Sequence, residues 1–337
     1  MDFQIPYGRG RLQGEIPDKN LAGIFESRVN RQRPAEGGES MIRQAIENPA
    51  GSERIEVLAK SADRAVIIAS DHTRPVPSRL IFPQLLQRLR SGNPNIDISI
   101  LIATGCHRAS TEAELIGKFG EEIVATEKIF MHDCRAETEM ASLGMLPSGG
   151  ELKINRMALE CELLLSEGFI EPHFFAGFSG GRKSVLPGIS SEKTVMGNHC
   201  ARFISDPNSR AGMLDGNPIH RDMLYAAEKA KLSFIVNVVI NGNREVIKAV
   251  AGNPFEAHRS GCNFLKDLCR VSVPETEIVI VGNGGYPLDQ NIYQSVKGMS
   301  AAESVCAPGG VIIMAAECSD THGGESFYRM LSEAPSP

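Results

Sequence analysis

Short and almost continuous apolar runs alternate along most of the chain with longer stretches whose apolar positions recur at helical spacing. The runs 64–70 (RAVIIAS) and 97–105 (DISILIATG) predict buried strands, and the amphipathic stretches 78–90 and 111–119 predict helices behind them. Strands that lack polar alternation and are separated by helices are typical of a parallel sheet covered on both faces. The pattern therefore predicts an α/β fold.

Two further apolar runs, 128–131 and 162–165, predict additional strands of the same sheet. Later in the chain, 234–240 and 245–250 flank the turn sequence NGN at 241–243. Asparagine and glycine tolerate the left-handed conformation that a tight hairpin turn requires. We therefore expect an antiparallel addition to an otherwise parallel sheet.

A change in pattern near Pro274 predicts a domain boundary, because a helix at 257–270 leads into the polar sequence VSVPETE. The later elements predicted are strands at 277–281 and 310–315 and helices at 291–304 and 324–331. Two strands make a poor independent core, so the second domain is expected to be incomplete where the chain stops at EAPSP. The expected organisation is two α/β domains, 1–272 and 275–337, with largely parallel sheets and the active site in the cleft between them.

Four polar loops are expected at the carboxyl ends of these strands, where open α/β sheets bind their ligands. They are 71–75 (DHTRP), 105–108 (GCHR), 171–183 and 289–297. We expect the four loops to converge on one cleft.

Composition narrows the function classes without changing the fold. A net charge of −6 argues against a general affinity for nucleic acid or acidic membranes. No apolar run approaches the ~20 residues that cross a bilayer, and the N-terminus lacks the apolar core of a signal peptide. Eight cysteines without a CxxC pair indicate reduced thiols rather than a disulfide framework, a zinc ribbon or an iron–sulfur cluster. A cytoplasmic enzyme is expected.

The segment 171–200 concentrates candidate chemistry, beginning with the glycine-rich sequence GFSGGRKS at 177–184. This sequence differs from a nucleotide-binding P-loop because Arg182 separates the last glycine from Lys183. Pro187 would also break the helix that a P-loop must open. A glycine bend whose backbone N–H groups hold one phosphate is the alternative.

Three histidines are the candidate acid/base or metal-binding groups. His107 follows a predicted strand, and His173 lies beside an aromatic pair that would keep its imidazole neutral. His199, in the sequence GNHC, is the best single metal-ligand candidate. Their spacing matches no local metal signature such as HExxH, so a bound metal and an acid/base pair both remain open.

Charged and amide side chains near these loops suit a carboxylate ligand. Arg74, which Pro75 and Pro77 follow and which lies three residues after Asp71, can bind a carboxylate in bidentate fashion or pair structurally with Asp71. Gln294 and Lys297 share one helix face at i and i+3.

Taken together, these segments resemble the lactate racemase family of nickel-pincer-nucleotide 2-hydroxyacid racemases and epimerases. The matching pieces are SDHTRPVP (70–77), ATGCHR (103–108), EPHFFAGFSGGRKSVLPGI (171–189), GNH (197–199) and YQSVKG (293–298). The long 171–189 match is the most specific.

The resemblance implies a nickel-pincer nucleotide, a pyridinium-3-thioamide-5-thiocarboxylic acid mononucleotide attached to Lys183. Ser179, Gly180 and Gly181 would help to bind this cofactor, and nickel would take its protein ligand from His199. A nickel site with sulfur and imidazole donors is chemically reasonable. Proteins that synthesise the cofactor and insert nickel would be partners.

The same resemblance implies catalysis by His107 and His173 on a small 2-hydroxy acid. One histidine would remove the hydroxyl proton while the hydrogen on C2 leaves as hydride, and two histidines would serve either hand of the substrate. The implied substrate-binding residues are Asp71, Arg74, Tyr293, Gln294 and Lys297. The chain stops earlier than other family members and has no tryptophan, so the choice among lactate, malate and larger acids stays open.

Two alternatives belong to other classes of function. A zinc-dependent hydrolase would use His107, His173 and His199 to activate water. A non-catalytic nickel or cofactor carrier would leave Arg74, Gln294 and Lys297 without a role.

Overall fold

The structure is a computed structural model that describes residues 1–335, and the chain forms two compact units. The larger unit comprises Arg28–His72 and Val76–Cys269, and the smaller comprises Met1–Ser27, Thr73–Pro75 and the residues from Arg270 onward. The first 27 residues thus group with the C-terminal segment, whereas the sequence had suggested one continuous domain over 1–272.

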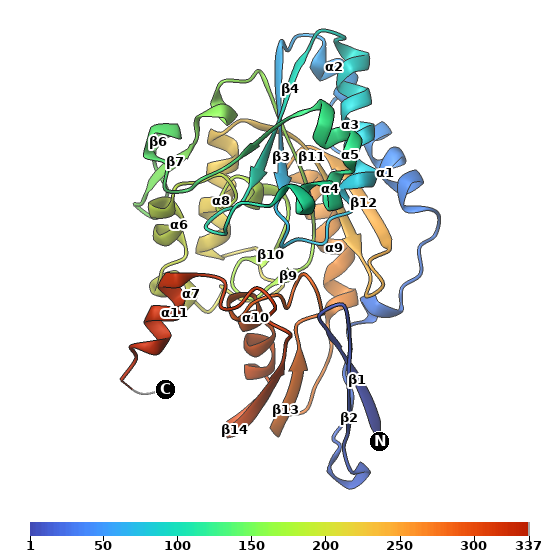
Figure 1. The fold of residues 1–337 in the computed structure, drawn as a ribbon, viewed down its shortest axis with the longest axis vertical. Helices are drawn as coiled ribbons and strands as arrows, with labels where there is room; N and C mark the ends of the chain where they lie inside the picture. The colour runs from blue at the N-terminus through green and yellow to red at the C-terminus, as the bar shows by residue number, and fades with distance from the viewer. Residues whose placement is uncertain (336–337) are drawn as a thin grey trace. The chain divides into compact units, whose positions relative to one another are not determined.

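A six-stranded sheet forms the centre of the larger unit (Figure 1). Its strands, in spatial order, are β12 (Val246–Gly252), β11 (Leu232–Ile240), β8 (Leu163–Phe169), β3 (Arg64–Ser70), β4 (Asp97–Ala103) and β5 (Lys128–Met131). All neighbours are parallel except β11 and β12, which pair antiparallel across the predicted hairpin. The expected mixed α/β fold with a largely parallel sheet is confirmed.

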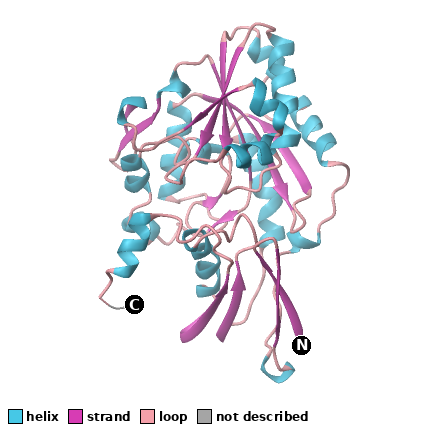
Figure 2. Ribbon diagram, viewed as in Figure 1, coloured by secondary structure: helices cyan, strands magenta, loops and turns pink. Residues whose placement is uncertain are grey.

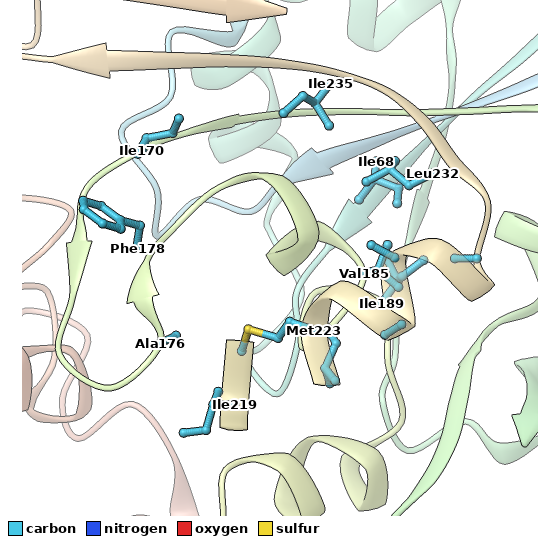
Figure 3. Packing of buried hydrophobic residues seen from close by; sticks show 14 of the residues in the cluster. Ile68, Ile170, Ala176, Phe178, Val185, Ile189, Ile219, Met223, Leu232 and Ile235 are labelled. Atoms are coloured by element: carbon cyan, nitrogen blue, oxygen red, sulfur yellow. The ribbon is translucent and has the colours of Figure 1, made fainter. Parts of the chain in front are cut away.

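Helices lie against both faces of this sheet (Figure 2), and a layer of buried apolar side chains packs between the helices and each face. Because side chains alternate along a strand, Ile67 and Leu165 face one layer while Ile68 and Leu164 face the other. The first layer packs against α1 (Gly38–Glu47), α2 (Ile55–Ala59) and α3 (Ser78–Gly92). The second, part of which Figure 3 shows, packs against α8 (Pro218–Lys229) and α9 (Glu256–Cys269).

The order of the strands reverses between β3 and β8. From β3 the chain adds β4 and β5 on one side, and it then returns to add β8, β11 and β12 on the other. In open α/β sheets the loops at such a reversal leave a crevice at the carboxyl ends of the strands, where ligands bind. The loops after β3, β4 and β8 are therefore the first places to look for a site.

Shorter elements complete the larger unit. They are the hairpin β6 (Met140–Met145) and β7 (Glu151–Asn155), the short pair β9 (Pro172–His173) and β10 (Gly177–Phe178), and α4 (Glu112–Phe119), α5 (Glu121–Thr126), α6 (Glu192–Asn198) and α7 (Ala201–Ile204). Within residues 1–335, none of the helices has the length and apolar character needed to cross a membrane.

Within the described residues, the smaller unit contains two pairs of strands, two α-helices and a short 3-10 helix at Asp18–Asn20. An antiparallel hairpin joins β1 (Asp2–Tyr7) to β2 (Gly10–Glu15), and a parallel pair joins β13 (Thr276–Gly282) to β14 (Cys306–Ala315). The helices are α10 (Ile292–Glu303) and α11 (Glu325–Ser332). The Gly8 N–H donates to the buried Asp289 carboxylate at 2.8 Å, and the Tyr286 N–H donates to the Gly8 carbonyl at 2.8 Å. These bonds explain why the N-terminal residues belong to this unit.

Candidate active site

The loops after β3 and β4 bring an aspartate and a histidine together. The Nδ1 atom of His107 lies 2.6 Å from an oxygen of Asp71, which is 2% exposed. The His107 loop is itself fixed, because the His107 N–H donates to the Thr104 carbonyl and the Gly105 N–H donates to the Gly188 carbonyl. An Nδ1–H donated to Asp71 leaves Nε2 of a neutral His107 as the ring atom that can accept a proton.

A capping box stabilises the helix behind this loop. The Thr111 hydroxyl accepts from the Glu114 N–H, and the Glu114 carboxylate accepts from the Thr111 N–H. Arg108 also binds both oxygens of Glu114, at 2.9 and 2.7 Å. The hydrogen bond from Arg108 lowers the pKa of Glu114 to about 2. The residues that follow His107 are thus anchored to α4.

The loop after β8 places His173 beside Lys183. The Lys183 Nζ lies 3.4 Å from Nε2 of His173, and the Ala176 N–H donates to Nδ1 of the same ring at 3.3 Å. His173 is 7% exposed and stacks on Phe174, while Phe175 meets it edge-on. The aromatic wall expected from the sequence is present.

Two glycines shape the bend that carries Lys183. Gly180 and Gly181 have φ angles of +75° and +53°, which favour glycine. A Cβ on Gly180 would lie 2.6 Å from an oxygen of Asn237, and the same oxygen accepts from the Gly181 N–H at 2.8 Å. The Ser179 hydroxyl donates to the Phe169 carbonyl at 3.0 Å. The cofactor-binding residues predicted from the sequence therefore form one rigid bend on the sheet.

Arg182 has a structural environment that the sequence did not reveal. Its guanidinium is completely buried, and it donates to the carbonyls of Ala176 and Gly180 at 2.7 and 3.2 Å. It also donates to Nδ1 of His220 at 3.0 Å and lies 3.0 Å from Nε2 of His258. Burial lowers the pKa of Arg182 to about 10. In the sequence, Arg182 could be recognised only as a basic residue inside a glycine-rich bend. That pattern does not identify its partners.

His199 ends α6 as its C-cap, and its ring meets Phe175 edge-on at 4.9 Å. Its Nδ1 is buried without a hydrogen-bond partner among residues 1–335. Burial, with a contribution from the charge of Lys183, lowers the pKa of His199 to about 3. A half-buried, neutral imidazole with one buried and unused nitrogen suits a metal ligand, so the position of His199 is compatible with the nickel ligand expected from the sequence.

The other predicted substrate residues lie in the smaller unit. The Arg74 guanidinium is 2.7 Å from the Thr73 hydroxyl and 3.5 Å from the side-chain oxygen of Gln294. Gln294 is buried in α10, and Tyr293, on the same helix, is 47% exposed. Lys297 lies one turn further along that helix. The structure therefore brings Arg74 and Gln294 together although 220 positions separate them.

The histidines do not form a cluster of metal-binding type. Across residues 1–335, no group of three or more histidine, cysteine, aspartate or glutamate side chains has a geometry suited to a metal ion. A zinc site built from His107, His173 and His199 therefore has no support in the arrangement of these side chains. All eight cysteines are free thiols, of which Cys134 and Cys262 are buried and Cys106 is exposed.

A doubly wound sheet with an Asp–His pair and a His–Lys pair at the carboxyl ends of its strands defines an enzyme of the α/β class. A family model described as the lactate racemase N-terminal domain matches residues 7–212, and one described as the lactate racemase C-terminal domain matches 271–337. This chain belongs to the lactate racemase family, and it is an isomerase.

Two lactate racemases are similar to this chain over essentially its whole length. A lactate racemase from Thermoanaerobacterium thermosaccharolyticum is 51% identical over 336 residues, and one from Lactiplantibacillus plantarum is 50% identical over 335 residues. These alignments cover 100% and 99% of this chain, and 79% of each relative. The solved lactate racemase apoprotein from T. thermosaccharolyticum superposes with a TM-score of 0.91, covering 100% of this chain and 79% of that one. The isomerase class excludes the hydrolase and carrier alternatives.

Proposed function

We propose that this enzyme racemises a 2-hydroxy acid of the lactate type. The observation that carries the proposal is 50–51% identity to two lactate racemases over essentially the whole chain. The Asp71–His107 and Lys183–His173 pairs support it, because they supply an oriented base and an attachment point beside a second histidine.

The two histidines have different partners at Nδ1, a carboxylate for His107 and a backbone N–H for His173. Asp71 accepts from Nδ1 of His107, which leaves Nε2 to take the proton of a substrate hydroxyl. The Ala176 N–H donates to Nδ1 of His173, and Nε2 of that ring faces Nζ of Lys183 at 3.4 Å, so Nε2 is the nitrogen on the side of the attachment lysine. In this proposal one histidine acts as the base and the other as the acid, and the roles exchange for the mirror-image substrate.

Lys183, with Ser179, Gly180 and Gly181, would hold a nickel-pincer nucleotide, and His199 would supply the protein ligand to its nickel. When bound, that group would supply an acceptor for the hydrogen and electron pair on C2. The buried, unpartnered Nδ1 of His199 fits this role. Phe175 contacts the rings of both His173 and His199. In this proposal it would limit the access of water to the two histidines.

The substrate carboxylate would bind to Arg74, with Gln294 and Lys297 on α10 and Tyr293 as a neighbouring contact. A guanidinium binds a carboxylate through two parallel hydrogen bonds, and the Thr73 hydroxyl already orients one edge of Arg74. The proposal also includes partner proteins that synthesise the cofactor and insert nickel. It further includes a cytoplasmic location, where free thiols persist.

Intact-protein and peptide mass spectrometry test the attachment. Protein made in a host that contains the cofactor pathway should carry an adduct on Lys183 and bind nickel, and Lys183→Arg should carry neither. The exposed Lys229, at the end of α8, provides a matched control, because Lys229→Arg should leave the adduct unchanged. Unmodified Lys183 in an enzyme that nevertheless racemises lactate would contradict the proposal.

The fate of the C2 hydrogen tests the reaction type. In deuterated water, the mirror-image lactate formed in early turnover should retain its original hydrogen at C2. Chiral chromatography followed by NMR measures that retention. Deuterium entering C2 as fast as product forms would show proton exchange in place of hydride transfer.

A further inference from the structure

Glu167 is the one charged side chain of β8, whose seven residues are all buried. Its side chain is 0% exposed. An ionisable group in such a strand is costly unless hydrogen bonds compensate for its lost hydration. The partners of this carboxyl group therefore indicate why it is there.

One oxygen of Glu167 accepts a hydrogen bond from a backbone N–H of β3, at the point where β3 and β8 stop pairing. The β3–β8 ladder ends at the pair Ile68 and Ser166, whereas β3 remains paired with β4 as far as Ser70. Where β3 leaves β8, the Ser70 N–H donates to Oε1 of Glu167 at 2.9 Å. The Ser70 hydroxyl donates to the same oxygen at 2.7 Å.

The second oxygen holds the other end of the following loop. The hydroxyl of Ser78, the first residue of α3, donates to Oε2 of Glu167 at 3.0 Å. Both residues that flank the loop 71–77 (DHTRPVP) are therefore bound to one carboxyl group. Lys118 of α4 adds a positive charge, with its Nζ 4.0 Å from Oε1.

The 71–77 loop carries two of the candidate site residues. Asp71 directly follows Ser70 and orients His107, and Arg74 lies in the middle of the loop. Fixing both ends of a loop reduces the conformations available to the residues between them. We propose that Glu167 is a positioning residue of the active site, which closes the 71–77 loop so that Asp71 and Arg74 keep their geometry. This proposal rests on the proposed function.

Substitutions in the cofactor-loaded enzyme separate positioning from simple stability. Glu167→Leu suits the apolar strand but removes both acceptors, and Ser78→Ala removes only one of the bonds. We expect kcat/KM for lactate to fall by roughly 100-fold in Glu167→Leu and roughly tenfold in Ser78→Ala, since small misplacements of catalytic groups cost such factors. KM should rise and kcat should fall together, because the loop carries both Arg74 and Asp71.

Conservative and control variants sharpen the test. Glu167→Gln keeps an acceptor for Ser70 and an amide for the Ser78 hydroxyl, so it should retain activity within a few-fold. Ser166→Ala removes a buried hydroxyl without a hydrogen-bond partner in residues 1–335, one position away on the same strand, and should behave like the wild type. Losses in Glu167→Leu and Ser78→Ala should be non-additive, because both break the same closure.

Hydrogen exchange provides a readout that does not depend on turnover. Amides of residues 70–78 should exchange at least about tenfold faster in Glu167→Leu and Ser78→Ala than in the wild type, with the β11 amides unchanged. The proposal would be overturned if the amides of residues 70–78 exchanged at the wild-type rate. It would also be overturned if each variant lost activity only in proportion to the fraction of its molecules that is unfolded. If the wild-type enzyme turned over no 2-hydroxy acid, the proposed function would fail, while the exchange data would still decide whether Glu167 closes the loop.

Discussion

The pairing of Asp71 with His107 determines which nitrogen of the imidazole would serve in the proposed catalysis. A carboxylate bound to Nδ1 holds the ring in one tautomer and one orientation. We expect Asp71→Asn to lower kcat roughly 100-fold or more, because the amide no longer enforces that tautomer. Chiral chromatography of lactate measures the rate, and a thermal melt within about 2 °C of the wild type would show that the fold is retained.

A buried histidine outside the proposed chemistry makes stability depend on pH. His132 is 3% exposed; its Nε2 lies 3.0 Å from the Ser190 carbonyl, and Asn155 approaches its Nδ1 at 3.4 Å. Burial lowers the pKa of His132 to about 4, whereas the unfolded value is near 6.5. The folded state therefore binds fewer protons than the unfolded state between these values.

The free energy of unfolding should accordingly fall as the pH drops from 6.5 to 4, with about 3 kcal/mol contributed by His132. Urea melts at several pH values measure this dependence. His132→Gln should be less stable near pH 7 and should show a flatter fall over the same window. An identical slope in both proteins would show that other groups control the acid sensitivity.

At the scale of elements, the bend that carries Lys183 tolerates little change. Gly180→Ala would force a side chain into a left-handed residue that already lies against Asn237. We expect a loss of roughly 1–3 kcal/mol in unfolding free energy, together with less adduct on Lys183, as measured by melts and mass spectrometry. Gly117→Ala is the matched control, since open space surrounds that position in α4 and alanine should stabilise the helix by about 0.5–1 kcal/mol.

The capping box of α4 gives a second expectation at this scale. Thr111→Ala removes the hydroxyl that accepts from the Glu114 N–H and should cost about 1 kcal/mol in denaturant melts. Thr126→Ala, at the exposed end of α5, removes a hydroxyl that does not cap a helix N-terminus and should cost less than about 0.5 kcal/mol. Equal losses would indicate that the capping box contributes nothing.

The sequence predicted the strands that consist of short apolar runs and the hairpin that has a typical turn sequence. The strands 64–70 and 128–131 and the hairpin around 241–243 match β3, β5 and the β11–β12 turn. The strand predicted at 162–165 is longer in the structure, because Ser166, Glu167 and Gly168 read as polar or breaking but are buried in the sheet. The N-terminal hairpin was missed: β1 alternates apolar residues at Phe3, Ile5 and Tyr7, but the partner strand GRLQGE shows no apolar alternation.

The candidate site was predictable where strand ends bring loops together. Asp71 and His107 follow neighbouring strands, and the structure places them in contact. The partners of Arg182 and Glu167 could not be predicted, because they depend on packing between residues up to 97 positions apart. A single charged residue within the run LLLSEGF was the available signal for Glu167.

At the scale of the molecule, the smaller unit depends on residues from the start of the chain. Ile5 in β1 lies against Gly282 in β13, and Gly8 binds Asp289. Deleting residues 1–27 should therefore increase hydrogen exchange in β13 and β14 at least about tenfold, while β3 and β8 stay protected. Unchanged protection of β13 and β14 would show that the hairpin contributes little to that unit.

The division of the chain between the two units also bears on the order of events at the ribosome. The larger unit is nearly complete once residue 269 has been synthesised, whereas the smaller unit combines residues 1–27 and 73–75 with the segment from 270 onward. Domains generally fold as they emerge, and the N-terminal hairpin must wait for β13 before it can pack. Arg74 therefore meets Gln294 only after residue 294 has been synthesised, so a nascent chain can fold its sheet before the residues proposed to bind the substrate carboxylate come together.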